Sequence, residues 1–163
     1  MVSDDGTVAS RRKEFMEATG AKGNLYFHAT SPDNANRIMA EGFNLDQESN
    51  GRSAGEGVYL HKDPREVAQY GEQIVGVKLA PGTRIAGKVD TTDATMTAIR
   101  QRKPGQDHGE AMLDHLHSWD YHGHTDVDDG SAIVHDPSRV KPVMNAPAPR
   151  QWREHWRNQG VIQ

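Results

Sequence analysis

The chain has 163 residues, a hydrophobic content of 34% and a formal net charge of −4 at pH 7. It contains no cysteine, which excludes disulfide bonds, thiolate metal sites and a cysteine nucleophile. The negative charge excludes a general basic footprint for nucleic acid, although a local basic patch stays open. No apolar run reaches membrane-spanning length, and residues 1–5 do not begin a signal peptide. We therefore expect a soluble protein that is cytoplasmic or is delivered into a host cell.

The N-terminal part of the chain, residues 1–23, is polar and rich in small residues. A helix is expected over residues 8–18, with Phe15 and Met16 as its large apolar groups. So few apolar groups favour a loosely docked arm. The basic run at residues 11–13 (Arg-Arg-Lys) reads as a solvated face.

The next segment predicts a strand followed by a helix. Residues 24–28 (NLYFH) are apolar, aromatic and short, which is typical of a strand. Ser31 or Asp33 then caps a helix that continues to about residue 41. Gly42 ends this helix as a left-handed cap. A polar loop follows over residues 46–56.

The most informative stretch is Gly51 to Gly71, GRSAGEGVYLHKDPREVAQYG. Its glycines lead into a short apolar strand that carries Tyr59. Asp63 suits the N-cap of a short helix, and proline follows it at the first helical position. Tyr70 closes that helix, so the two tyrosines offer flat faces from two neighbouring elements.

The remaining elements mix strands and helices without a regular βαβ alternation. We expect strands over residues 73–79, 84–87, 131–135 and 139–143, and helices over residues 91–100 and 107–119. The first of these strands alternates as a half-buried strand does, and Met96 and Ile99 are expected to face inward from the first helix. These elements predict an α+β fold with mixed, mostly antiparallel pairing and short flanking helices.

The end of the chain is expected to hold a linker and a tail. Residues 146–149 (Ala-Pro-Ala-Pro) read as the linker, and residues 151–158 as a short helix. Trp152 and Trp156 share one face of this helix, which favours docking back on the sheet. The expected organisation is an arm (1–23), one main domain (24–145) and a linker with a tail helix (146–163).

Three segments carry a family resemblance: LYFHATS, GEGVYLHKDPREVAQYG and SAIVHDPSRVKP. Together they resemble the ADP-ribosyltransferase superfamily, in its diphtheria-toxin/PARP-like branch. That branch has a strand-end His, a G-x-G-(I/V)-Y-(F/L) strand, a second Tyr after a short helix, and a late acidic residue that opens a strand. The resemblance covers roughly residues 24 to 143 and implies a split, mostly antiparallel sheet.

This resemblance implies an NAD-dependent mono-ADP-ribosyltransferase that releases nicotinamide and modifies a protein or nucleic acid. His28 would hydrogen-bond the adenine-side ribose, and the backbone of Ala29 would hold the nicotinamide amide. Tyr59 and Tyr70 would sandwich the nicotinamide ring, a cation that an aromatic face attracts. The cofactor-binding residues implied are His28, Ala29, Thr30, Gly57, Tyr59 and Tyr70.

Two positions depart from the family pattern. Ala29 stands where the family has glycine, and Ser131 stands where it has the catalytic Glu. Serine supplies no charge to stabilise an oxocarbenium-like transition state. Asp129, two residues earlier, faces the same side if the segment is extended, and Asp126 and Asp128 are also near. We expect Asp129 to replace the carboxylate, with Ser131 and Tyr59 as the other catalytic residues, and transfer of single ADP-ribose units.

Each assignment has a plainer alternative. His28 also suits a histidine that caps a neighbouring carbonyl, and Tyr59 and Tyr70 suit ordinary core aromatics. Asp129 with Gly130 is also a strong turn signal. The missing Glu leaves two further activities open: an NAD-binding or ADP-ribose-binding module without turnover, and an NAD glycohydrolase.

A histidine-rich segment precedes the late strand. Its members are His108, His115, His117, His122 and His124, with Asp114, Asp120 and Asp126. No HExxH motif is present, so we expect solvent-facing histidines and no metal. The expected partners are NAD, as substrate, and a macromolecular target, with no membrane. Small stand-alone domains of this kind occur as bacterial toxins and phage effectors.

Overall fold

The computed structural model describes residues 6–44, 57–101, 104–105, 107–125 and 129–162. The expected loop at 46–56, Asp126 and Asp128 lie outside these residues. The chain divides into two compact units. The first comprises Met1–Gly42, Leu60–Lys78 and Lys141–Gln163, and the second Phe43–Tyr59 and Leu79–Val140. Within the described ranges, none of the helices combines the length and the apolar character needed to cross a membrane.

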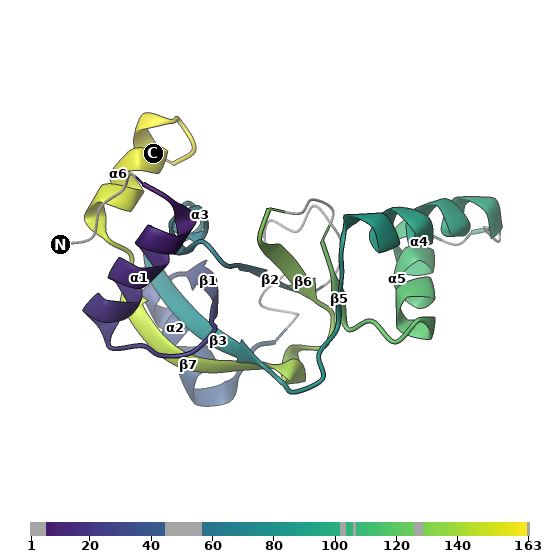
Figure 1. Cartoon of the computed structure of the whole chain (residues 1–163), viewed down its shortest axis with the longest axis horizontal. Helices are drawn as coiled ribbons and strands as arrows, with labels where there is room; N and C mark the ends of the chain where they lie inside the picture. Colours follow the sequence, from purple (N-terminus) through teal and green to yellow (C-terminus); the bar gives the residue numbers. More distant parts are fainter. Residues whose placement is uncertain (1–5, 45–56, 102–103, 106, 126–128, 163) are drawn as a thin grey trace. The chain divides into compact units, whose positions relative to one another are not determined.

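The fold is α+β, as expected, and the first unit holds four helices and most of four strands among its described residues. Its elements are α1 (Val8–Thr19), β1 (Tyr26–Thr30), α2 (Pro32–Glu41), β2 (Val58–His61, which begins in the second unit), α3 (Pro64–Val67), β3 (Gln73–Leu79), β7 (Val140–Pro147) and α6 (Arg150–Asn158). The strand order is β2-β1-β3-β7. β1 is antiparallel to β2 and β3. Figure 1 shows α1 in front of these strands and α2 behind them.

Helix caps in this unit follow the sequence signals. The side chain of Ser31 accepts a hydrogen bond from the backbone of Asn34, which starts α2, and Asp63 caps α3 in the same way. Gly42 ends α2 with a φ of 84° and a ψ of −177°. The positive φ explains the glycine, but the expected left-handed cap is wrong because ψ is extended.

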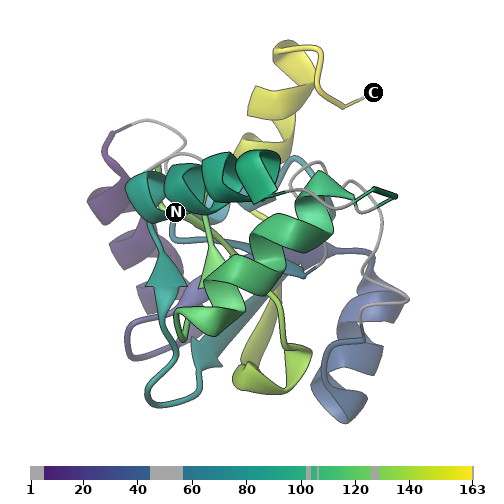
Figure 2. The ribbon, with the colours of Figure 1, turned by 90° about the vertical axis from the view of Figure 1, so that its right-hand side faces the viewer.

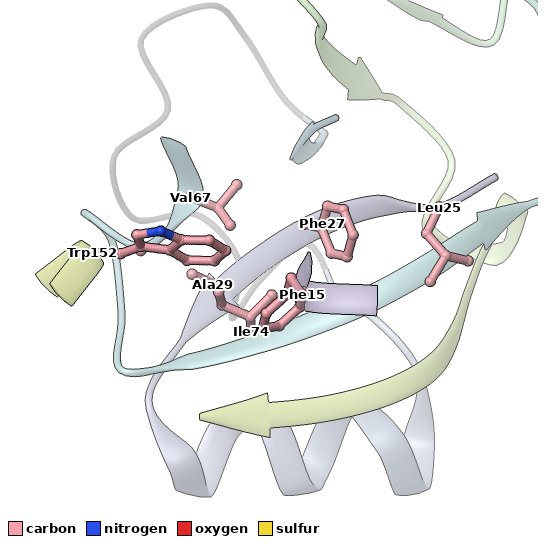
Figure 3. Packing of buried hydrophobic residues seen from close by; sticks show 8 residues of the cluster. Phe15, Leu25, Phe27, Ala29, Val67, Ile74 and Trp152 are labelled. Atoms are coloured by element: carbon pink, nitrogen blue, oxygen red, sulfur yellow. The ribbon is translucent and has the colours of Figure 1, made fainter. Parts of the chain in front are cut away.

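The core of the first unit contains residues from early and from late in the sequence. Phe15 of α1, Phe27 of β1 and Trp152 of α6 are all buried. The Phe15 ring lies 5.7 Å from Phe27, edge-on, and 5.4 Å from Trp152. Figure 3 shows these side chains gathered with Val67 and Ile74 on one side of β1 and β3. The expectation of a loosely docked arm is therefore wrong, whereas the expected docking of the two tryptophans is confirmed.

Two strands differ from the sequence prediction, one in its burial and one in its extent. In β3, residues Ile74 to Val77 are buried without a break, so the expected half-buried alternation is wrong. The cause is that β3 lies between two other strands and has helices on both faces. β7 includes Ala146 and Pro147, and the Ala148 N–H donates to the Glu72 carbonyl at 2.8 Å. The expected linker is thus part of the sheet edge.

The second unit holds the remaining strands and two packed helices. Its elements are β4 (Ile85–Ala86), α4 (Lys88–Gln101), α5 (His108–Ser118), β5 (Gly123–His124), β6 (Ser131–Val134) and the 3-10 turn η1 (Pro137–Arg139). β5 lies between β4, to which it is parallel, and β6, to which it is antiparallel. β5 had no sequence signal, because a two-residue strand shows no periodicity.

Small residues of α4 face α5. Thr91, Ala94 and Ala98 are buried, and Ala94 packs with Met112 and Leu116 of α5. Figure 2 shows the two helices side by side. The expected inward positions of Met96 and Ile99 are wrong, since these side chains are 44% and 48% exposed. The helix turns its small side chains inward because they allow close approach to α5.

Candidate functional site

The first unit places His28 within β1 rather than at its end. β1 continues to Thr30, which pairs with Gln73, while His28 pairs with Val75. Phe27 and Ala29 are buried in the core, so His28 and Thr30, which alternate with them, lie on the other face and are partly exposed. His28 is thus held by a paired strand and is partly exposed.

Gly71 is packed directly against the end of β1. A Cβ atom at this position would lie 2.5 Å from the Thr30 nitrogen and closer still to the Thr30 carbonyl oxygen. No side chain fits there, so glycine is required for space rather than for its backbone angles. The contact holds residue 70 beside the strand end that follows His28.

Tyr70 presents its ring to solvent from this position. Its side chain is 56% exposed, and its N–H donates to the Val67 carbonyl at 2.9 Å. The alternative that Tyr70 is a core aromatic is therefore wrong. His28, Ala29, Thr30 and Tyr70 all belong to the first unit.

A buried ion pair fixes the short helix that leads to Tyr70. The Arg11 Nη2 lies 2.7 Å from Asp63 Oδ2, and the two side chains are 6% and 2% exposed. The hydrogen bond to Asp63 raises the pKa of Arg11 above its ordinary value, against the desolvation that lowers it. Arg12 donates to the carbonyls of Leu25 and Lys62. The expected solvated basic face is wrong for these two arginines, because α1 is docked.

In the second unit, Gly57 serves the packing of the chain. A Cβ there would lie 2.5 Å from the Ile133 Cγ2 and 2.7 Å from the Val134 carbonyl oxygen, both on β6. The sequence predicts that this glycine lets a cofactor approach, but β6 occupies the space beside it. Tyr59, two residues on, is partly buried on β2.

The start of β6 gathers three polar side chains. Asp129 Oδ1 accepts from the Ser131 N–H at 2.9 Å, and Ser131 Oγ lies 3.0 Å from Thr125 Oγ1. Gly130 has a φ of 95°, so the segment is a turn and the assumed extended geometry is wrong. The carboxylate nevertheless reaches Ser131 through its hydrogen bond. The sequence did not indicate Thr125, because only the pairing of β5 with β6 brings it to Ser131.

Three histidines of the second unit form a hydrogen-bonded chain. His117 Nε2 lies 2.8 Å from His135 Nδ1, and His135 Nε2 lies 2.7 Å from His124 Nδ1. His124 is fully buried, so the expectation of solvent-facing histidines is wrong for it. Burial, and then the neighbouring His124, His117 and His122, lower the pKa of His135 to about 3. No group of three metal-ligating side chains with the geometry of a metal site occurs in the described part of the chain.

The hydrogen-bonded histidines predict that the folded protein loses stability in acid. A histidine in the unfolded chain has a pKa near 6.5 and becomes protonated below it. In the folded protein the lowered pKa keeps His135 neutral over the same pH range, so protonation favours the unfolded chain. Stability is complete above about pH 6.5 and falls as the pH drops toward about 3. The urea midpoint, followed by circular dichroism, should be lower at about pH 5 than at about pH 8. His135→Gln should flatten this dependence and His108→Gln, at an exposed position, should not; equal slopes in all three proteins would refute the assignment.

A scan against protein-family models and a search of curated proteins gave no match. The functional interpretation therefore rests on the residues and their geometry. In the first unit these are His28, Ala29, Thr30 and Tyr70; in the second they are Tyr59, Asp129 and Ser131, with Thr125 added.

Proposed function

We propose that the protein is an NAD-dependent mono-ADP-ribosyltransferase with an ADP-ribosyltransferase-like fold. A nucleophile of the target attacks the ribose carbon that bears nicotinamide. The carbon–nitrogen bond breaks, nicotinamide leaves with the electron pair, and the nucleophile's proton passes to solvent. The observation that carries the proposal is the contact of Gly71 with Thr30, which holds Tyr70 beside the end of the strand that bears His28.

The residues have distinct roles in this proposal. His28 holds the adenine-side ribose, while the Ala29 backbone and Thr30 contact the cofactor at the end of β1. The exposed ring of Tyr70 offers a face to the cationic nicotinamide. Asp129, hydrogen-bonded to the Ser131 backbone, supplies negative charge to the ribose as positive charge develops there.

Incubation with NAD labelled in the ADP-ribose part tests the function. A macromolecular extract serves as the source of targets. Label on macromolecules supports the transferase. Free ADP-ribose supports an NAD glycohydrolase, and saturable binding without turnover supports a binding module.

Tyr70→Ala should weaken NAD binding about tenfold, because a cation over an aromatic ring contributes about 0.5 to 2 kcal/mol. Calorimetric titration measures this effect. Tyr70→Phe keeps the ring and should bind NAD as the wild type does. Tyr26→Ala is the matched control, since Tyr26 begins the same strand as His28 and its ring lies under Lys62. Equal affinity in Tyr70→Ala and wild type would remove Tyr70 from the site.

A further inference from the structure

A groove of about 500 Å³ lies in the first unit, along one side of α6. Three arginines of that helix line it, Arg150, Arg153 and Arg157, together with Glu72 at the start of β3 and Glu154. The volume is within the range of small-ligand sites. The arginines fall at i, i+3 and i+7, so they form one stripe along the helix.

The helix that presents these arginines is firmly anchored. On its opposite side Trp152 is fully buried, and the Trp156 Nε1 donates to the Arg65 carbonyl at 2.6 Å. Arg153 Nη1 donates to the Ala68 carbonyl, also at 2.6 Å, which fixes one end of its guanidinium. The helix backbone and the Arg153 side chain are therefore held in place, which lowers the entropy that a ligand would lose in ordering them.

The charges of the groove leave one net positive site. Arg150 Nε lies 3.0 Å from Glu154 Oε1, so these two side chains largely neutralise each other. Among the described residues, the guanidinium of Arg157 has neither a hydrogen-bond nor an ion-pair partner. Arg153 and Arg157 lie about 6 Å apart along the helix axis. Two guanidinium forks at this spacing suit one carboxylate, while Glu72 disfavours a chain of phosphates.

Apolar surface completes the groove. Pro32, the first residue of α2, and Pro147 and Ala148, at the end of β7, lie along it. Gln73 also lines it and pairs with Thr30, so the groove begins at the end of the strand that carries His28. A bound segment would need a negative group and small apolar neighbours, which a polypeptide provides.

We propose that this groove binds a peptide segment of a protein partner, with an Asp or Glu side chain held between Arg153 and Arg157. The binding itself does not depend on the transferase activity. It rests on the proposed function only in one further step, in which the bound protein is the acceptor of ADP-ribose. A nucleic acid would fit the arginines but not the carboxylate of Glu72.

Fluorescence anisotropy without NAD tests the binding, so that a failure here leaves the transferase assay unaffected. The probe is a fluorescein-labelled peptide that repeats Ala-Glu-Pro. The same peptide with Gln in place of Glu, and an oligothymidylate of equal charge, are the comparisons. Arg157→Gln should weaken binding of the Glu peptide about tenfold, and Arg153→Gln/Arg157→Gln further. Arg100→Gln, an exposed arginine at the end of α4, should bind as the wild type does.

The outcomes separate clearly. The proposal holds if the Glu peptide binds at least about tenfold more tightly than the Gln peptide and this preference is lost in Arg157→Gln. It is overturned if neither peptide binds, if Arg100→Gln weakens binding equally, or if oligothymidylate binds more tightly than the Glu peptide. Thermal unfolding of each variant checks its fold. Arg157 is exposed, so Arg157→Gln should leave the fold intact. This variant alone decides the test if the double variant disturbs α6.

Discussion

Arg11→Met is expected to lower the free energy of unfolding of the first unit by about 3 to 5 kcal/mol. The substitution leaves the Asp63 carboxylate buried without its cation, and removing one partner of a buried pair costs far more than the pair contributes. Asp63 also caps α3, so the loss should loosen the segment that leads to Tyr70. Urea denaturation at neutral pH measures the change.

Two further variants identify the cause. Lys13→Met removes a cation from the same helix, but this side chain is 76% exposed and pairs with Glu17 at 4.0 Å. It should change stability by less than about 1 kcal/mol. Adding Asp63→Asn to Arg11→Met should restore much of the loss, because the amide keeps an acceptor for the cap without a buried charge. If Arg11→Met proves as stable as Lys13→Met, the ion pair is not what anchors α3.

Asp129→Ala is expected to reduce the kcat of ADP-ribose transfer about a hundredfold, which corresponds to about 3 kcal/mol. The reason is that the developing positive charge on the ribose loses its carboxylate. Ser131, which stands where the ADP-ribosyltransferase pattern that the chain resembles has a Glu, cannot supply that charge. The measurement is the rate of label transfer at saturating NAD with an identified target. Ser131→Glu should leave the rate intact or raise it, since it restores the usual carboxylate.

The sequence offers a closely matched control at Asp136. Its Oδ1 accepts from the Ser138 N–H at 2.9 Å, as Asp129 Oδ1 accepts from the Ser131 N–H two residues on. These hydrogen bonds lower the pKa of Asp136, so it is also a carboxylate at neutral pH. Asp136→Ala therefore removes a carboxylate with the same backbone hydrogen bond, and should retain the wild-type rate. Wild-type turnover in Asp129→Ala would show that another group, or none, serves as the catalytic acid.

The elements that were predicted well are those whose signals are local. Ser31 and Asp63 each cap the helix that follows, as a short polar side chain before an apolar pattern indicates.

The features that the sequence did not predict involve residues whose contacts are far away in the sequence. Phe15 looked too isolated to anchor a helix, but its core neighbour Trp152 comes from the other end of the chain. Gly57 and Gly71 are required by the backbones of Val134 and Thr30, which no local pattern reveals. His135 was not grouped with the earlier histidines, because only the pairing of β5 with β6 brings it to His124.

The Phe15–Trp152 contact also determines when the first unit can complete its fold during synthesis. Domains usually fold as their residues leave the ribosome, N-terminal parts first. Here α1 emerges early, but the indole that covers Phe15 is translated more than a hundred residues later. Until then the face of β1 and β3 that bears Phe27 and Ile74 stays partly open to water. The nascent chain would thus depend on its last helix to bury this surface, and a stall before that helix would leave it exposed to aggregation.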